Sequence, residues 1–281
     1  ICNLDCPFCL VGTQNYHNTS HSNLDRDAGI MKPQLFDKVL DDAIEMKFER
    51  VSLYFQGEPT MNRNIVDYVA KTVSAGFECT ISTNGILLDR RIEGLKKYPL
   101  TLRISADGAS EETYVQNRVG GDFHQVVQNM KLAVASRHPR TRVEWQFIVM
   151  RNNEHEIQMA KALAKEIGIP LVLKTFSPSV PDLVPKNPNW RRQMLPKPCY
   201  TVSHMMGVYD NGDVVPCCYD VEGKRVMGNA RNQTLKEIWL SEKYRQFRRK
   251  VLNVDDLDIE ICQSCGRWSS ETPRRKIEAS D

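Results

Sequence analysis

The 281-residue sequence contains no long apolar run. A helix that crosses a bilayer needs about 20 consecutive apolar residues, and no segment comes near that length. The chain also has no strong excess of one charge, because 38 basic residues are set against 35 acidic ones. Proteins that bind nucleic acids usually concentrate positive charge. These two absences argue against a membrane protein and against a nucleic-acid partner.

The sequence shows neither a signal peptide nor an initiator methionine, and we therefore expect further residues before Ile1. A disulfide framework is not indicated either. The nine cysteines are an odd number and include two C-x2-C pairs, which suits metal thiolates better than disulfides. Reduced thiols predict a cytoplasmic location.

Strand-like and helix-like segments alternate between residues 31 and 176. Apolar residues at helical spacing predict helices over 31–46, 64–76, 88–98, 123–137 and 154–168. Apolar or alternating runs predict strands over 50–59, 78–85, 101–108, 142–151 and 170–176. The first is expected to run into a Gly-Pro turn, and the second to end at Asn84-Gly85. Repeated strand–helix units indicate an α/β fold with parallel strands and helices outside, and a sixth strand could precede Cys2.

The pattern changes after residue 176. Residues 177–198 hold six prolines, which predicts a linker or an irregular wrap. Residues 204–218 predict a hairpin that turns at Asn211-Gly212. Residues 232–252 predict an amphipathic helix that begins after a cap at Thr234.

These changes set the expected domain boundaries. We expect an α/β core over residues 1–180, whose first strand is missing from the sequence. A proline-rich linker follows over residues 181–198, and a small C-terminal domain occupies residues 199–281.

Four of the predicted strands have a polar face as well as an apolar one. In a barrel-like sheet, one face meets the helices and the other faces the interior. The residues expected inside are Ser52, Tyr54, Gln56, Glu58, Thr80, Ser82, Asn84, Arg103, Ser105, Asp107, Arg142, Glu144 and Gln146. A purely structural barrel fills its interior with branched apolar residues. The polar interior predicts a large polar ligand, with a satisfied polar network as the alternative.

Cysteines are concentrated near both ends of the chain. Cys2, Cys6 and Cys9 have C-x3-C-x2-C spacing. Three thiolates can bind one face of an iron–sulfur cube and leave one iron open to another ligand. On spacing alone, the alternative is a zinc site completed by a distant ligand such as His17 or His21.

A second set of cysteines lies after residue 198. Its members are Cys199, Cys217, Cys218, Cys262 and Cys265. Four of them could close either an iron–sulfur cluster or a zinc site, and residue type alone does not separate the two. Cys79, in contrast, lies on the helix-facing side of its strand, which predicts a buried structural thiol.

An ordered set of motifs accompanies the first three cysteines. Phe8 precedes the third cysteine, "GEP" stands at 57–59, "STNG" at 82–85 and "SADG" at 105–108. Together they resemble the radical S-adenosylmethionine (SAM) superfamily over residues 1 to about 176. The resemblance implies a partial (β/α)6 barrel, similar to a TIM barrel, with the cysteine loop after the first strand.

The same resemblance implies the cofactors and the chemistry. Cys2, Cys6 and Cys9 would hold a [4Fe–4S] cluster, and SAM would bind its fourth iron. Reduction would then cleave SAM to a 5′-deoxyadenosyl radical that abstracts a substrate hydrogen. We expect the electron to come from a flavodoxin- or ferredoxin-like donor.

The resemblance also implies which residues contact SAM. They are Phe8, Gly57, Glu58, Pro59, Ser82, Asn84, Ser105 and Asp107. The GEP turn would bind the amino group of SAM with Glu58 nearby, and Ser105 and Asp107 would lie near its ribose or methionine part. One departure is Gln56, which replaces the first glycine of the usual pair and is expected to tighten the turn.

The C-terminal region has a resemblance of its own. A hairpin, "MGN" at 227–229, a helix and a C-x2-C pair occur in the order of the auxiliary-cluster domain called SPASM, in its shortened "twitch" form. This implies one auxiliary [4Fe–4S] cluster on Cys199, Cys217, Cys262 and Cys265, with Cys218 to spare.

The one-auxiliary-cluster arrangement resembles the 2-deoxy-scyllo-inosamine dehydrogenase type. It implies oxidation of an alcohol in a small polar substrate, similar to a sugar or cyclitol, with the auxiliary cluster as electron acceptor. Glu144 is a candidate base and Arg103 a candidate substrate contact; the alternative is an ion pair of Glu144 with Arg103 or Arg142.

Two other functions remain open from the sequence. One is a SPASM maturase that modifies a peptide or protein by epimerisation, thioether formation or sulfatase-type maturation. The other, not an enzyme, is a zinc-stabilised binding module.

Overall fold

The computed structural model describes residues 1–9, 11, 29–176, 180–191, 199–252, 259–263, 265 and 275–277. His17 and His21, the alternative zinc ligands, lie outside these residues. The chain divides into two compact units. The first comprises Ile1–Asn23, Glu49–Arg192 and Pro273–Asp281, and the second comprises Leu24–Phe48 and Gln193–Thr272.

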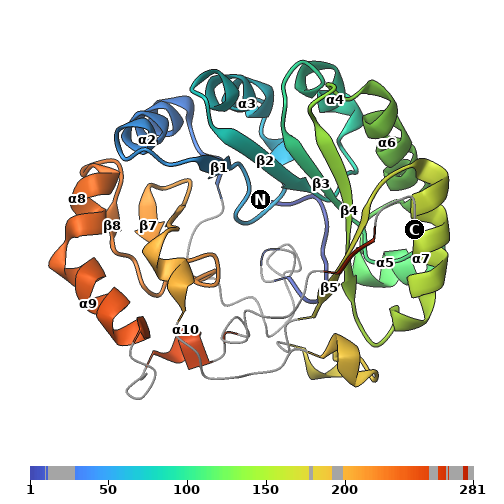
Figure 1. Cartoon of the computed structure of the whole chain (residues 1–281). Coiled ribbons are helices and arrows are strands. Elements are labelled where there is room, and N and C mark those ends of the chain that lie inside the picture. The colour runs from blue at the N-terminus through green and yellow to red at the C-terminus, as the bar shows by residue number, and fades with distance from the viewer. Residues whose placement is uncertain are drawn as a thin grey trace. The chain divides into compact units, whose positions relative to one another are not determined.

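A parallel sheet forms the centre of the first unit (Figure 1). Its strands in chain order are β1 (Arg50–Ser52), β2 (Glu78–Thr83), β3 (Thr101–Ser105), β4 (Arg142–Val149) and β5 (Leu171–Thr175). All five were predicted, and the α/β class is confirmed. The short strand β9 (Arg275–Ile277), which pairs with β5 in the antiparallel direction, was not predicted.

Helices cover the outer face of this sheet (Figure 1). They are α3 (Ile65–Ser74), α4 (Asp89–Leu95), α6 (Phe123–Ser136) and α7 (Ile157–Ile167), close to their predicted bounds. Helix α5 (Glu111–Asn117) was not predicted, because about two turns are too few to show a clear apolar period. The hydroxyl of Ser110 caps it by accepting from the Thr113 backbone N–H.

The first predicted strand is longer than the observed one. It was expected to run from Arg50 into a Gly-Pro turn at 57–59, but β1 ends at Ser52. Gly57 has a φ of +76°, and a 3-10 turn follows over Pro59–Met61. A left-handed glycine and a proline cannot continue a strand ladder, so the residues after Ser52 form a loop at the carboxyl end of β1.

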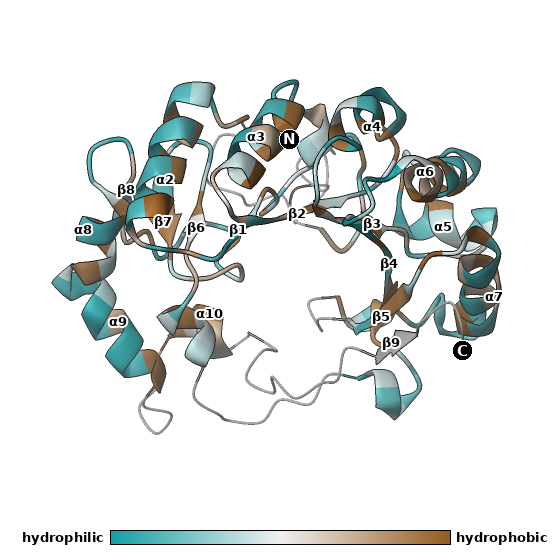
Figure 2. Cartoon of the chain, turned by 45° about the horizontal axis from the view of Figure 1, so that its top comes forward, coloured by the Kyte–Doolittle hydropathy of each residue, from teal (hydrophilic) through white to brown (hydrophobic). Residues whose placement is uncertain are grey.

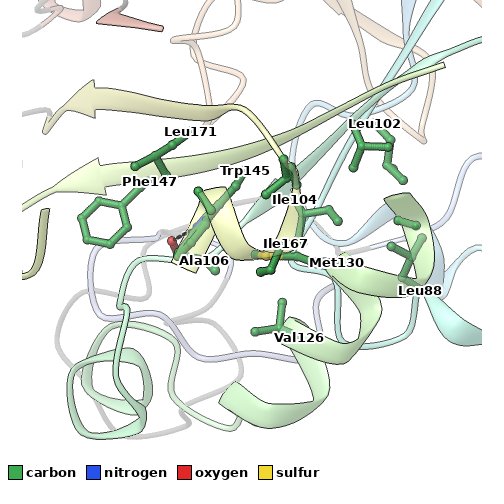
Figure 3. Close-up of a cluster of buried hydrophobic side chains, with 14 of the residues drawn as sticks. Leu88, Leu102, Ile104, Ala106, Val126, Met130, Trp145, Phe147, Ile167 and Leu171 are labelled. Carbon is green, nitrogen blue, oxygen red and sulfur yellow. Dashed lines mark hydrogen bonds between the residues drawn. The ribbon is translucent and has the colours of Figure 1, made fainter. Parts of the chain in front are cut away.

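Apolar side chains from the sheet and its helices form the core of the first unit (Figure 3). Ile104 and Trp145 on neighbouring strands are fully buried with Met130 of α6. The Trp145 indole donates to the carbonyl of Ala106 at 2.8 Å, so its one polar group is satisfied. In Figure 2 the hydrophobic colouring of β4 marks the same core. Burying each large apolar side chain contributes about 1.5–3 kcal/mol.

Cys79 lies in this core, 3% exposed, as strand alternation predicts. Burial raises the pKa of its thiol from 9.0 to about 12. The folded state therefore favours the neutral thiol. This contribution is complete below pH 9 and is lost as the pH rises from 9 towards 12.

We expect the protein to lose about 1.4 kcal/mol of stability per pH unit above pH 9 relative to Cys79→Ala. Urea unfolding of both proteins at pH 8, 9 and 10 measures this difference. Parallel pH dependences of the two proteins would contradict it.

The second unit contains short strands and helices. They are α2 (Pro33–Glu45), β6 (Gly207–Val208), β7 (Asp213–Val215), β8 (Gly228–Asn229), α8 (Leu235–Leu240), α9 (Glu242–Leu252) and α10 (Glu260–Gln263). The predicted hairpin is confirmed as the antiparallel pair β6–β7, to which β8 adds a third strand. Helix α2 belongs to this unit, where the Asp42 carboxylate accepts from the Leu235 backbone N–H at 3.0 Å.

The predicted helix over 232–252 is two helices instead of one. Ser241 has a ψ of 149°, which ends α8 and starts α9. The cap at Thr234 is confirmed: its hydroxyl accepts from the Glu237 N–H, and the Glu237 carboxylate accepts from the Thr234 N–H.

The proline-rich segment is described over residues 180–191. It forms 3-10 turns at Pro181–Leu183 and Pro188–Trp190 and belongs to the first unit. The carboxylate of Glu154 accepts from the backbone N–H groups of Lys186 and Asn187, each at 3.0 Å. The described part is therefore an irregular wrap, one of the two predicted alternatives. In the described parts of the chain, no helix is long and apolar enough to span a bilayer.

Candidate active site

The carboxylate of Glu58 organises the loops after β1 and β2. It is 5% exposed. One oxygen accepts from the Thr60 N–H at 2.9 Å, the Thr60 hydroxyl at 2.5 Å and the Thr83 hydroxyl at 2.6 Å. The other accepts from the Asn84 N–H at 2.7 Å. Glu58 thus fixes the positions of the "GEP" and "STNG" motifs relative to each other.

Replacing Glu58 with glutamine should destabilise the protein by about 3 kcal/mol, because an amide NH2 group would face donors that now have an acceptor. The urea unfolding midpoint of cluster-free protein measures the loss. Glu93→Gln is the matched control, since its exposed pair with Lys96 should contribute under about 1 kcal/mol. Equal midpoints for the two variants would contradict the role of Glu58.

The first residue of the cysteine loop contacts the GEP turn. The Glu58 N–H donates to the carbonyl of Ile1 at 2.9 Å. A side chain at position 57 would place its Cβ 2.3 Å from the same carbonyl oxygen, so the close approach requires glycine.

Two further strand ends hold the same loop. After β2, the Asn84 amide donates to the Asn3 side chain at 2.9 Å and lies 3.9 Å from the Cys2 sulfur. After β3 and α5, the carbonyl of Val119 accepts from the Asp5 N–H at 2.9 Å. The three-cysteine loop therefore lies at the carboxyl ends of the parallel strands, where α/β enzymes bind their ligands.

Phe8 and Arg118 complete the surroundings of the loop. The Phe8 ring meets Phe176, just after β5, edge to face at 6.0 Å between ring centres. The Arg118 guanidinium lies 5.5 Å from the centre of the Phe8 ring. Sequence reasoning missed Arg118 because α5, the helix before it, was not predicted.

The three thiols of the loop are close to one another and largely shielded from water. Burial raises the pKa of Cys2, and that of Cys6 to about 11, and the negative charges of the neighbouring cysteines add to both shifts. The thiols are therefore near one another, and the folded chain by itself favours the neutral forms of Cys2 and Cys6. Metal binding supplies that charge and favours the thiolates.

The donor set also suits a cluster. Thiolates are the usual ligands of iron–sulfur clusters, and a cluster bonds each thiolate to a different iron. Three cysteines on one loop, Cys2, Cys6 and Cys9, therefore fit a [4Fe–4S] cluster in ligand type and number.

The interior face of the sheet carries two rows of polar side chains. Near the carboxyl ends, the hydroxyls of Ser82 and Ser105 lie 3.5 Å apart, and the Gln146 amide donates to Ser105 at 3.3 Å. Nearer the amino ends, register places Arg103 opposite Glu144. The predicted polar interior is present in both rows.

Glu144 makes ion pairs with two arginines. Its carboxylate oxygens lie 3.2 Å from Arg103 and 3.2 Å from Arg142. Arg103 also donates to the Tyr54 hydroxyl at 3.0 Å. Both carboxylate oxygens are therefore already paired, so the geometry favours the predicted ion-pair alternative, and the catalytic role of Glu144 stays a prediction.

The second cysteine set lies within the second unit. Cys199 precedes a 3-10 turn (Tyr200–Ser203), Cys217 follows β7, and Cys262 and Cys265 are buried at α10. Burial raises the pKa of Cys217 and of Cys262 to about 12, and the charges of Cys199, Cys217 and Cys265 add to the shift of Cys262. The four predicted ligands are therefore neighbours, and their thiol chemistry fits an iron–sulfur cluster.

The loop that carries Cys217 is fixed by a buried carboxylate. Asp220 is almost fully buried and accepts from the backbone N–H groups of Lys224 and Arg225 at 2.9 and 2.8 Å. The Tyr209 hydroxyl donates to the Asp220 carbonyl. Sequence reasoning did not single out Asp220, because an aspartate in a turn is common and its burial cannot be read from spacing.

A parallel sheet with a three-cysteine loop at its carboxyl ends, together with a second four-cysteine set, defines an iron–sulfur enzyme built on an α/β barrel. The chain belongs to the radical SAM superfamily, whose family model matches residues 1–165. A model described as an iron-sulfur cluster-binding domain, SPASM, matches residues 199–266. Membership implies a [4Fe–4S] cluster with SAM and an auxiliary iron–sulfur centre. When bound, the [4Fe–4S] cluster and SAM together supply a 5′-deoxyadenosyl radical.

Two named relatives match almost the whole chain. The S-adenosyl-L-methionine-dependent 2-deoxy-scyllo-inosamine dehydrogenase of Niallia circulans is 22% identical, over 96% of this chain and 91% of its own length. The tungsten-containing aldehyde ferredoxin oxidoreductase cofactor-modifying protein of Pyrococcus furiosus is 23% identical, over 94% of this chain and 86% of its own.

Solved structures share the fold at lower identity. BtrN in complex with AdoMet and 2-DOIA is 19% identical with a TM-score of 0.60, covering 98% of this chain and 94% of that one. Streptococcus suis SuiB bound to precursor peptide SuiA is 14% identical with a TM-score of 0.71, covering 92% of this chain and 70% of that one. These likenesses establish the fold.

Proposed function

We propose that this radical SAM enzyme is an oxidoreductase that converts an alcohol of a small polar substrate, similar to a sugar or cyclitol, to a carbonyl. The observation that carries the proposal is the combination of one four-cysteine auxiliary set with a near full-length match to a 2-deoxy-scyllo-inosamine dehydrogenase. The auxiliary cluster would serve as the one-electron acceptor that such an oxidation needs.

Alcohol oxidation balances with SAM and an auxiliary cluster as the two acceptors. With SAM and both clusters bound, the SAM-derived radical would accept a hydrogen atom from the carbinol carbon, and solvent would accept the hydroxyl proton. The auxiliary cluster would accept the remaining electron, which leaves the carbonyl. The protein must bind the substrate hydroxyl groups, and the Gln146 side chain, on the interior face beyond the SAM motifs, supplies a donor and an acceptor for that purpose.

The residue assignments are part of this proposal. We assign the radical-generating cluster to Cys2, Cys6 and Cys9, and the auxiliary cluster to Cys199, Cys217, Cys262 and Cys265. We assign SAM contacts to Phe8, Gly57, Glu58, Pro59, Ser82, Asn84 and Ser105. For Glu58, the contact is with the turn it stabilises, because both its carboxylate oxygens already accept hydrogen bonds.

A direct test uses the full chain reconstituted with iron and sulfide without oxygen. We expect 5′-deoxyadenosine to form in proportion to a carbonyl product when SAM, a reductant and 2-deoxy-scyllo-inosamine or related cyclitols are supplied. A substrate deuterated at the carbinol carbon should transfer deuterium to 5′-deoxyadenosine. Failure of every cyclitol and sugar to raise 5′-deoxyadenosine above the substrate-free level would contradict the proposal.

Peptide modification is the second candidate. The fold likeness to SuiB bound to its precursor peptide favours it. Short peptides added to the same assay separate the two candidates, because a maturase would change peptide mass or stereochemistry while cyclitols stay unreacted.

We further propose an electron donor of the flavodoxin or ferredoxin type, since SAM cleavage consumes one electron per turnover. Reduced flavodoxin with its reductase should replace dithionite in the assay. Activity with dithionite but not with either reduced carrier would count against this partner.

A further inference from the structure

Asp107 is fully buried behind the carboxyl ends of β3 and β4, and its groups are occupied. One carboxylate oxygen accepts from the Ile148 N–H at 2.7 Å, and the other pairs with Arg118 at 2.5 Å. Its carbonyl accepts from the amides of Asn117 at 2.7 Å and Asn153 at 3.1 Å. The carboxylate is thus fully buried between these two partners, whereas the motif implied a contact with SAM.

Arg118 connects this buried carboxylate to the cysteine loop. One guanidinium nitrogen, Nη2, is paired with Asp107, while Nη1 lies 3.7 Å from the Cys6 sulfur. The face of the guanidinium lies over the Phe8 ring. The next residue, Val119, accepts from the Asp5 N–H, so the backbone on both sides of the contact is fixed.

The contact is electrostatic as well as geometric. Arginine stays protonated in proteins, and the rigid fork of its guanidinium can donate to two acceptors at once. The Cys6 residue is buried, at 4% exposed, so little water screens its interaction with Arg118.

We propose that Arg118, held by Asp107, is a positioning residue that donates to the Cys6 thiolate and raises the reduction potential of the radical-generating cluster. Hydrogen bonds to cluster sulfurs and nearby positive charge stabilise the reduced, more negative state. The proposal rests on the assignment of the cluster to Cys2, Cys6 and Cys9. Asp107 then acts through Arg118 and not on SAM.

The test is a redox titration of the SAM-free, reconstituted full chain, followed by electron paramagnetic resonance. The signal that changes on later addition of SAM identifies the cluster that binds SAM. We expect Arg118→Gln to lower the equilibrium constant for reducing this cluster about tenfold, which is about 59 mV for a one-electron couple. Arg137→Gln is the matched control, because Arg137 donates to the Val134 carbonyl on α6 and should leave the potential unchanged.

Arg118→Lys keeps the charge but cannot reach both acceptors with a planar fork, so its shift should be smaller and in the same direction. An unchanged potential in Arg118→Gln overturns the proposal. If Arg118→Gln takes up no iron at this site, the potential of Arg118→Lys is the test. A wild-type potential in Arg118→Lys then overturns the proposal.

Two further measurements separate the possible failures. The first is Asp107→Asn, with SAM affinity and the SAM-free potential both measured. If this variant binds SAM more weakly but keeps the wild-type potential, Asp107 contacts SAM and its role in holding Arg118 is overturned. Absence of any SAM-responsive signal in the unsubstituted protein would instead overturn the cluster assignment.

Discussion

Replacing Cys6 with alanine should abolish 5′-deoxyadenosine formation and lower the iron content from about eight atoms per chain to about four. Cys6 is the most buried of the three loop cysteines and the one that Arg118 contacts. Without its thiolate, the cube has two protein ligands at this site and is lost on desalting. Iron analysis and chromatographic measurement of 5′-deoxyadenosine, both without oxygen, give the two readings.

Cys79→Ala is the matched control for this experiment. Its sulfur lies in the apolar core of the sheet and meets no other cysteine there. The variant should keep about eight irons and wild-type SAM cleavage, with a stability loss of about 1 kcal/mol from the small cavity. A Cys6→Ala protein that still cleaves SAM would show that the radical-generating cluster is not held by this loop.

The elements of the first unit were predictable because burial leaves a period in the sequence. Cys79 and Ile81 point to the helices and are both buried, as their alternation requires. The prediction was wrong where the backbone departs from the ladder. The Gly-Pro turn ends the run as expected, with Gly57 in the left-handed region, but the alternation from Arg50 onward does not show that β1 already ends at Ser52.

Very short elements could not be predicted from the sequence for a different reason. Strand β9 has three residues and pairs with β5 across more than 90 positions of chain, so its partner cannot be read from local pattern. Ser241 breaks the predicted long helix, although apolar residues keep a helical period on both sides of it.

The cysteines of the site were predictable from spacing, since thiolates on a loop and a C-x2-C pair have a chemistry that few other patterns share. The charged residues that surround these cysteines were not predictable in the same way. Alternation places Asp107 and Glu144 on a face, but it does not say which cation each one meets. For Glu144, Arg103 and Arg142 were named as alternatives, and the structure shows that both pair with it. For Asp107, the partner Arg118 follows the unpredicted helix α5 and became visible only in the structure.

Replacing Cys262 and Cys265 together with alanine should separate SAM cleavage from substrate oxidation. Both thiols are buried at α10 and packed with Tyr244 and Val251 of α9 in the core of the second unit. Their loss leaves Cys199 and Cys217 unable to hold a cluster, so iron should fall to about four per chain. The cluster in the first unit keeps all its ligands, and substrate-dependent 5′-deoxyadenosine should therefore still form.

The carbonyl product should fall to background in this variant, because the ketyl radical has no one-electron acceptor and either takes back a hydrogen atom or decays. Deuterium from a substrate labelled at the carbinol carbon would then exchange into SAM-derived products without net oxidation. Cys218→Ala is the matched control: it neighbours the second cluster in sequence and should leave about eight irons and full oxidation. Wild-type product formation in the double variant with about four irons would contradict the electron-acceptor role. Loss of SAM cleavage together with unfolding of the second unit, detected by limited proteolysis, would show instead that its cluster is structural.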